Sequence, residues 1–137
     1  GNIAILASDL SDAVIAIGAA GRYPKESVDA VPEKLRATWL RDQGSQVEVI
    51  EQVRKLVRFR RLNLLRPWPM SGLFDVIFCR NVMIYFDEPT KAELLSRFSN
   101  VLAPGGFLYI GHSERLLGPV QRDFSQVGQT IYQKAAA

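Results

Sequence analysis

Arginine, asparagine and tyrosine side chains follow a short apolar run near the middle of the sequence. The run Val76–Cys79 leads directly into Arg80 and Asn81, and Tyr85 comes four residues later. An almost uninterrupted apolar run of this length predicts a strand buried on both faces, as in a parallel sheet covered by helices. Because ligands of open α/β sheets bind beyond the carboxyl ends of such strands, we expect these three residues at a binding site.

Each of these residues also has a purely structural interpretation. Arg80 and Asn81 can cap the strand and fix the next loop. Tyr85 can belong to the core, with its hydroxyl bonded to the backbone. The single histidine, His112, lies in a G-H-S-E loop and is more typical of a loop-fixing hydrogen bonder than of a general base.

A second apolar run lies at the start of the sequence and ends in an acidic turn. Ile3–Ala7 predicts a buried strand, and Ser11 is a typical cap for a helix that ends at Gly21. Asp9 lies between strand and helix, where nucleotide-binding α/β folds place a carboxylate against ribose hydroxyls. Asp9 is equally typical of a plain turn or helix cap.

Composition limits the class of protein. With 137 residues and 47% hydrophobic content, the chain predicts one globular domain. Its net charge of +3 is too small to argue for nucleic acid. No apolar segment approaches the roughly 18 residues of a membrane span. The lone Cys79 excludes an internal disulfide and fits a reducing compartment, so we expect a cytoplasmic protein without membrane insertion.

Residues 22–58 predict an inserted β-subdomain. Pro24, Pro32 and Gly44 break this segment, and Pro32–Leu40 predicts a short helix. Gln46–Ile50 and Leu56–Arg60 predict strands, and alternation in the second indicates one wet face. We therefore expect both strands in a small antiparallel sheet, separate from the buried parallel one.

The last third of the sequence predicts a helix between two strands. Asp87 begins the helix, which ends before Pro104–Gly106, and Phe107–Ile110 predicts the next strand. Phe124–Val127 and Gln129–Gln133 predict further strand, which is expected to pair antiparallel with Phe107–Ile110, with a kink or bulge at Gly128.

The motifs between Phe74 and Glu114 are distinctive. F-D-V-I-F-C-R-N-V-M-I-Y-F-D, followed by a helix and L-A-P-G-G-F-L-Y-I-G-H-S-E, closely resembles the chemotaxis receptor methyltransferases of the CheR family. L-A-S-D-L-S and V-R-F-R-R-L-N-L-L agree in order upstream, so the resemblance covers nearly the whole chain. It implies an α/β, Rossmann-like methyltransferase sheet and transfer of methyl groups from S-adenosylmethionine (SAM) to receptor glutamates, with S-adenosylhomocysteine as product.

The resemblance also implies roles for individual residues. Asp9 is expected to hold the cofactor ribose, while Asn63 and Leu64 flank its adenine. Arg80 and Asn81 border the methionine side, and Tyr85 orients the incoming glutamate. Residues 22–58 are expected to contact the receptor's cytoplasmic helices. The loop Arg41–Gln46 looks short for gripping a receptor-tail peptide, so we expect a tail-independent member.

The sequence also departs from the family pattern. The family's N-terminal helical domain and its first strand with a glycine-containing loop are not in this sequence. We therefore expect a C-terminal fragment that does not methylate by itself. Loss of a central strand leaves two neighbours with unpaired edges, which predicts a strand-exchanged dimer or a rearranged sheet.

The proposed reaction needs few catalytic groups. A glutamate carboxylate has a pKa of about 4.3, so it is already the nucleophile at neutral pH. We therefore expect a positioning Tyr85 and a carboxylate-binding Arg80, with no metal centre. Two alternatives stay open, namely a SAM methyltransferase with another acceptor and a non-catalytic partner-binding domain.

A basic run near the predicted second strand has two interpretations. It is either the solvated face of that strand or a docking surface for acidic receptor helices. The run comprises Arg54, Lys55, Arg58, Arg60, Arg61 and Arg66.

Overall fold

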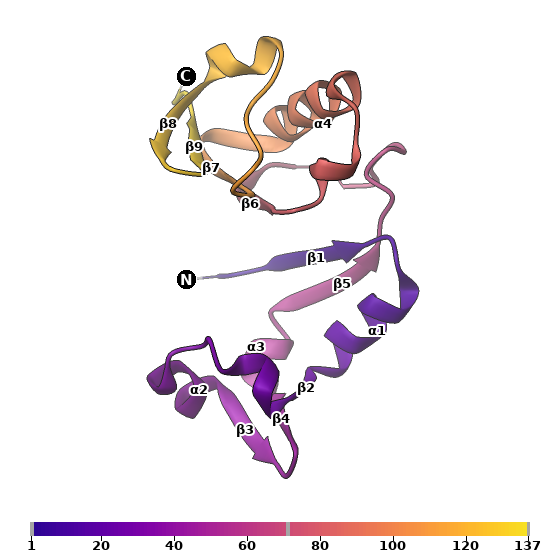
Figure 1. The fold of residues 1–137 in the computed structure, drawn as a ribbon, viewed down its shortest axis with the longest axis vertical. Helices are drawn as coiled ribbons and strands as arrows, with labels where there is room; N and C mark the ends of the chain where they lie inside the picture. The colour runs from indigo at the N-terminus through magenta and orange to yellow at the C-terminus, as the bar shows by residue number, and fades with distance from the viewer. Residues whose placement is uncertain (1, 71, 137) are drawn as a thin grey trace. The chain divides into compact units, whose positions relative to one another are not determined.

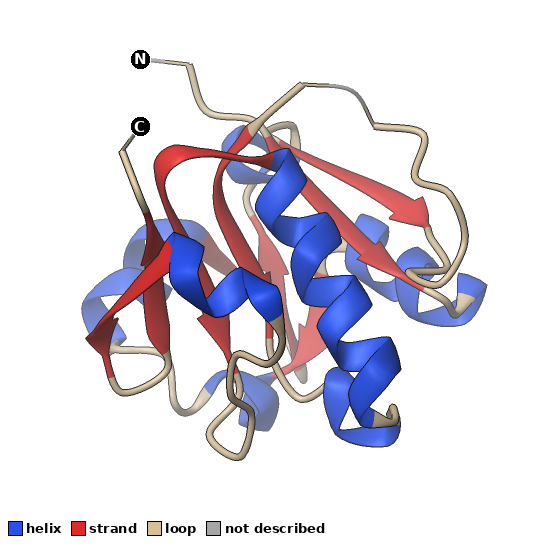
Figure 2. Ribbon diagram, turned by 90° about the horizontal axis from the view of Figure 1, so that it is seen from above, coloured by secondary structure: helices blue, strands red, loops and turns tan. Residues whose placement is uncertain are grey.

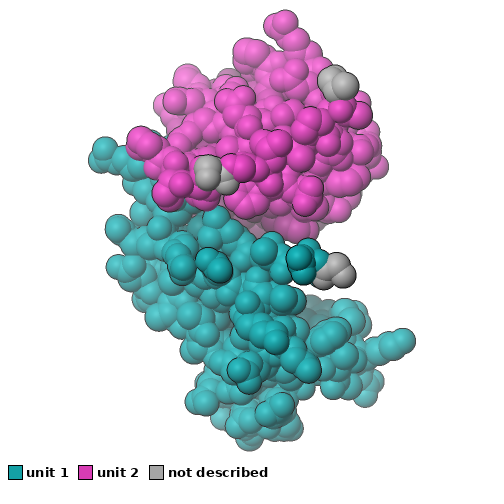
Figure 3. Space-filling view, turned by 180° about the vertical axis from the view of Figure 1, so that it is seen from behind, with its two compact units in different colours: residues 1–66 teal, residues 67–137 magenta. Residues whose placement is uncertain are grey.

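The computed structural model describes residues 2–70 and 72–136, which form two compact units. Unit 1 spans residues 1–66 and unit 2 spans residues 67–137 (Figure 3). Both units combine helices with sheets (Figures 1 and 2), which confirms the predicted α/β class. No helix in the described ranges is both long enough and apolar enough to cross a membrane.

Unit 1 is built on a parallel strand pair joined by a helix and a small sheet. Its elements in chain order are β1 (Ile5–Asp9), α1 (Asp12–Ala20), β2 (Arg22–Pro24), η1 (Lys25–Val28), α2 (Glu33–Trp39), β3 (Leu40–Gln43), β4 (Gln46–Val49), α3 (Glu51–Arg54) and β5 (Val57–Arg61). β1 and β5 pair in parallel, with Ile5 opposite Val57 and Asp9 opposite Arg61. Both strands therefore end at the same edge.

Helix α1 begins and ends where its sequence predicts. Ser11 caps it, because its side chain accepts a hydrogen bond from the Val14 amide. Gly21 ends it in the left-handed conformation, with φ of 68°. Gly18 lets the helix approach β5, because a Cβ there would lie 2.3 Å from the Phe59 ring. These contacts fix the turn between β1 and α1 in which Asp9 lies.

A three-stranded antiparallel sheet follows, in the order β2-β4-β3. Hydrogen bonds from Arg22 and Lys25 hold the pKa of Glu48 and Asp42, respectively, below their ordinary values. Gln46–Val49 forms part of this sheet, as predicted for Gln46–Ile50, but the same prediction for Leu56–Arg60 is wrong. That segment is β5, which pairs in parallel with β1, because alternation reports a wet face and not the direction of the partner strand.

Unit 2 is a mixed four-stranded sheet with the order β6-β7-β9-β8. Its elements are β6 (Phe74–Cys79), η2 (Met83–Tyr85), α4 (Glu88–Val101), β7 (Leu102–Ile110), η3 (Pro119–Asp123), β8 (Phe124–Gly128) and β9 (Ile131–Lys134). β6 and β7 are parallel, whereas β9 pairs antiparallel with β7 as predicted. The ladder between β8 and β9 shifts register beside Gly128, which confirms the predicted irregularity.

The core of unit 2 lies on one face of this sheet. Leu94, Leu95 and Phe98 of α4 are buried, together with Leu108 and Ile110 of β7. Helix α4 begins at the predicted position, since the Asp87 side chain accepts from the Thr90 amide, and this bond lowers the pKa of Asp87.

The prediction that the Phe74–Cys79 strand is buried on both faces is wrong. Cys79 is buried, but Val76 and Phe78, which lie on the opposite face of the strand, are 42% and 69% exposed. The ring of Phe78 stacks on Tyr109 at 4.5 Å between centroids. Among the described residues of unit 2, α4 packs against one face only, so the apolar side chains of the second face stay exposed.

Three parallel strands have one edge without a partner among the described residues. β1 and β5 pair only with each other, and β6 pairs with β7 alone. The missing-strand interpretation predicts unpaired edges on two neighbouring strands, and it stays a prediction. Unpaired N–H and C=O groups along such an edge favour pairing with another strand.

Each unit contains one tryptophan. Trp39 ends α2 in unit 1 and is 44% exposed. Trp68 in unit 2 lies with its ring centroid 5.4 Å from that of Phe98, and the Arg97 guanidinium carbon lies 4.2 Å from the Trp68 centroid. Trp68 is therefore held by an aromatic and a cation–π contact within its own unit.

Candidate functional site

The polar residues of unit 1 gather at the edge where β1 and β5 end. Asp9 is the last residue of β1 and lies opposite Arg61, the last residue of β5. The Leu62 amide donates to the Asp9 carbonyl at 2.9 Å, so the loop after β5 is tied to the end of β1. Asn63 and Leu64 follow in this loop and are half-buried. The structure thus brings the three predicted residues of unit 1 to one edge.

One carboxylate oxygen of Asp9 forms a turn, and the other has no partner among the described residues. Its Oδ1 accepts from the Ser11 amide at 2.8 Å, the hydrogen bond expected of a turn-forming aspartate. The side chain is exposed, and none of the described residues bonds to Oδ2. One carboxylate oxygen therefore fixes the turn while the other is positioned to accept from a ligand hydroxyl.

Asn63 is held in a similar way. Its Oδ1 accepts from the Leu65 amide at 3.0 Å, and its carbonyl accepts from the Arg66 amide at 3.0 Å. This tight turn leaves the side-chain nitrogen Nδ2 as the donor with which Asn63 can recognise a ligand such as the edge of a base.

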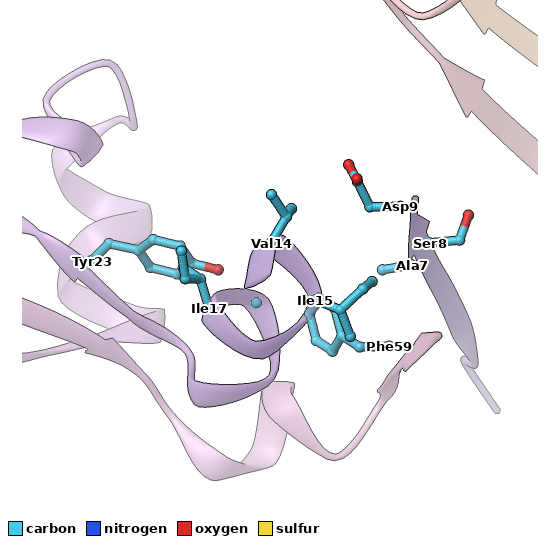
Figure 4. A pocket seen from close by; sticks show the side chains of 9 residues that line it. Ala7, Ser8, Asp9, Val14, Ile15, Ile17, Tyr23 and Phe59 are labelled. Carbon is cyan, nitrogen blue, oxygen red and sulfur yellow. The ribbon is translucent and has the colours of Figure 1, made fainter. Parts of the chain in front are cut away.

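A pocket of about 240 Å³ in unit 1 includes Asp9 in its lining (Figure 4). Figure 4 shows side chains from β1, α1, β2 and β5 around it, and the lining is largely apolar. Val14 and Ile17 contribute from the helix, and Phe59 contributes from β5. An acidic group beside an apolar wall suits a ligand with both hydroxyl groups and a flat apolar part.

The polar residues of unit 2 follow the carboxyl end of β6. Arg80 and Asn81 come directly after Cys79, and both are exposed. Asn81 adopts φ of 62°, a left-handed conformation that asparagine tolerates better than most residues. Tyr85 ends η2 and is 82% exposed, which excludes its interpretation as a core residue. The structure thus gathers these three predicted residues at one end of β6.

Sequence reasoning missed one residue of this region. Glu114 is 7% exposed, and its carboxylate accepts from the Gly111, Asn81 and Met83 amides at 2.7, 3.1 and 3.0 Å. A glutamate three residues after a strand-ending glycine was the available signal. By contrast, His112 is exposed beside it, as a loop residue would be.

The arginines of the basic run differ in environment. Arg58 and Arg60 are exposed, as expected for the wet face of β5, and Arg61 is exposed at the end of the strand on the opposite face. Arg60 donates to the Phe59 carbonyl at 2.8 Å, and Arg61 donates to the Leu10 carbonyl at 3.0 Å. Arg58 and Arg60 therefore give one face of β5 two exposed positive charges, whereas Arg61 lies 3.8 Å from the Asp12 carboxylate.

Cys79 is buried at the end of β6. Burial, followed by the negative charge of Glu114, raises the pKa of its thiol to about 12. Since the thiolate is the reactive form, Cys79 behaves as a small apolar core residue.

We predict that ionisation of Cys79 lowers the free energy of unfolding at high pH. The folded protein keeps the thiol proton up to about pH 12, whereas the unfolded chain loses it near the ordinary pKa of 9.0, so unfolding becomes easier between these values. Chemical denaturation at several pH values measures this slope, and Cys79→Ala is the control that removes it. Equal slopes for wild type and Cys79→Ala would contradict the prediction.

Comparison with solved structures agrees with the α/β fold described above. An N-methyltransferase, NodS from Bradyrhizobium japonicum WM9, aligns with a TM-score of 0.53 over 96% of this chain and 74% of that chain, at 14% identity. At this identity the likeness concerns the fold alone, and it confirms the predicted methyltransferase-type fold.

Sequence relatives are closer. A probable chemotaxis protein methyltransferase of Rhizobium etli is 43% identical over 93% of this chain and 49% of that protein. Chemotaxis protein methyltransferase 2 of Pseudomonas aeruginosa is 41% identical over 97% of this chain and 49% of that protein. The chain spans about half the length of these relatives. A family model described as CheR methyltransferase, SAM binding domain, matches residues 1–133, and the chain therefore belongs to the CheR methyltransferase family.

Proposed function

We propose that the whole protein transfers methyl groups from SAM to glutamate side chains of chemotaxis receptors. The observation that supports this most directly is the placement of polar residues at strand ends. Asp9 and Asn63 lie where β1 and β5 end, and Arg80 and Asn81 lie where β6 ends. Carboxyl ends of parallel strands are where α/β folds bind nucleotide-like ligands.

The residues fit the parts of SAM by their chemistry. Asp9 Oδ2 would accept from the ribose hydroxyls, while Asn63 Nδ2 and the Leu64 side chain would recognise the adenine. Arg80 supplies positive charge for a carboxylate on the methionine side, which Asn81 borders. Bound SAM supplies an activated methyl group on a sulfonium.

The chain's residues then have to position the acceptor. A glutamate oxygen forms the new C–O bond as the C–S bond breaks, and no proton moves in this step. Tyr85 is exposed at the end of η2 and is proposed to orient the glutamate. Correct positioning can contribute on the order of 7–11 kcal/mol to such a reaction. No general base is required, because the glutamate carboxylate is already ionised at neutral pH.

We propose that the acceptor is a helix of a receptor's cytoplasmic region, so that the protein acts in the cytoplasm. The exposed arginines of β5 and the small sheet β2-β4-β3 offer the docking surface. Complementary charge would attract acidic receptor helices and speed their association at low salt.

An acceptor assay tests the proposed function. The whole protein is incubated with SAM carrying a labelled methyl group and with a receptor fragment in which glutamates at the methylation sites are kept or replaced by alanine. Label is expected on the glutamate form only, as an alkali-labile ester. Equal label on the alanine form would favour a methyltransferase with another acceptor. No label on either form, together with retained SAM binding, would favour the non-catalytic alternative.

We further propose that residues 1–137 self-associate in isolation through the unpaired edges of β1 and β6. Light scattering across a concentration series is expected to show a dimer. The double substitution Ile5→Lys and Val76→Lys places charges on these two strands and is expected to restore the monomer. A monomer at every concentration for the wild-type segment would refute this proposal.

A further inference from the structure

Glu114 has no role in the proposed function so far, although it is an unusual residue. Of the residues that the structure describes, it is the only charged one that is buried. It lies four residues after the end of β7, in a turn closed by its own amide, which donates to the Gly111 carbonyl at 3.1 Å. Burying a carboxylate is costly unless hydrogen bonds compensate it, so its partners indicate its role.

Its carboxylate joins the loops that follow two neighbouring strands. Oε1 accepts from Gly111 of the loop after β7 and from Asn81 of the loop after β6, while Oε2 accepts from Met83. These loops are adjacent because Cys79 and Ile110 are opposite each other in the parallel ladder. One side chain therefore holds both loops by three backbone amides.

The loop after β6 has a conformation that depends on these bonds. Asn81 is in the left-handed region at φ of 62°, and Met83 is 1% exposed. Glu114 holds the amides of both residues, two positions apart, and thereby fixes the bend between β6 and η2. Arg80 precedes this bend and Tyr85 follows it, so the directions of both side chains depend on it.

Gly111 supports the same arrangement. A Cβ at this position would lie 2.6 Å from Glu114 Oε1 and 2.7 Å from Asn81 Oδ1. The close approach of the carboxylate therefore requires a residue without a side chain at the end of β7.

We propose that Glu114 is a positioning residue for methyl transfer, which keeps the Arg80–Tyr85 loop in its active shape without touching the reactants. This inference rests on the proposed function. The carboxylate matters because both of its oxygens accept hydrogen bonds. A carboxamide has one oxygen and one NH₂ group, and the NH₂ group would face at least one of the three backbone amides. Glu114→Gln is nearly the same size and therefore isolates the acceptor chemistry.

The experiment compares Glu114→Gln with Glu93→Gln in the whole protein. Glu93 is exposed on α4 and serves as a matched control for loss of one carboxylate. Losing one hydrogen bond to a charged group is expected to lower kcat about tenfold or more, while KM for SAM changes by less than about threefold. Assays are run well below the melting temperature of each variant, so that lost stability alone does not lower kcat.

Amide NMR signals provide a second readout that does not need activity. The signals of Asn81, Met83 and Gly111 are expected far downfield in the wild type and to move upfield in Glu114→Gln. If Glu114→Gln does not fold, Gly111→Ala disturbs the same contacts from the other side and is expected to lower kcat in the same way.

Failure of the positioning role and failure of the proposed function would give different results. Unchanged kcat in Glu114→Gln, with an active wild type, overturns the positioning role and leaves the proposed function standing. A wild type that binds SAM without methylating glutamate overturns the proposed function. In that case, unshifted amide signals in Glu114→Gln would overturn the loop contacts as well, and shifted signals would support them.

Discussion

Replacing Arg80 by alanine in the whole protein is expected to lower kcat/KM for methyl transfer about 10- to 100-fold, from the value of hydrogen bonds to charged groups. Arg80 is exposed directly after β6, beside Asn81 in its constrained left-handed conformation. In the proposed site its guanidinium faces a carboxylate on the methionine side, where removing the positive charge weakens binding and misaligns the methyl group. Steady-state kinetics with varied SAM and varied receptor measures the loss.

Two variants make this test specific. Arg80→Lys keeps the charge but loses the planar fork, so an intermediate loss is expected if Arg80 binds a carboxylate through two bonds. Arg122→Ala removes an exposed arginine from η3 and is expected to leave the kinetics unchanged. Equal kinetics for wild type and Arg80→Ala would exclude Arg80 from the site.

Replacing Asp9 by alanine is expected to weaken binding of S-adenosylhomocysteine about 10- to 100-fold, because a charged acceptor of ribose hydroxyls is lost. The structure separates the turn contact of this carboxylate from its proposed contact with the ribose. Oδ1 holds the Ser11 amide at 2.8 Å, and the ribose would use Oδ2. Asp9→Asn keeps an acceptor for Ser11 while removing the charge, so it is expected to weaken binding with little loss of stability.

Calorimetric titration of the whole protein measures both Asp9 variants. Asp12→Asn is the matched control, because Asp12 is an exposed carboxylate in the first turn of α1, three residues after Asp9. Binding that is unchanged in Asp9→Asn and weakened in Asp9→Ala would assign Asp9 to the turn alone. Unchanged binding in both variants would remove Asp9 from the proposed site.

Features with a local physical cause could be predicted from the sequence. Ser11 and Asp87 cap helices because their side chains accept from amides three residues on. Gly21 ends α1 because glycine adopts positive φ without strain. The positions of Asp9 and Arg80 at strand ends follow from the apolar runs that precede them.

Features that depend on distant partners could not be predicted. The alternation in β5 correctly predicts exposed Arg58 and Arg60, but it carries no information on strand direction, which is set by pairing with β1. The apolar run of β6 indicates that both faces of the strand are apolar enough to be buried. It does not indicate whether another element covers the face on which Phe78 lies. The Asn81 and Met83 partners of Glu114 lie 33 and 31 residues away, and the local G-H-S-E pattern can reveal only its contact with Gly111.

The division of the two tryptophans between the units has a practical consequence for folding experiments. Trp39 reports on residues 1–66, and Trp68, packed against Phe98 and Arg97, reports on residues 67–137. With Trp39→Phe or Trp68→Phe, the fluorescence of the remaining indole follows the unfolding of one unit alone. Superimposable emission curves from the two variants would mean that both units melt in a single cooperative step, and displaced midpoints would mean that they melt independently.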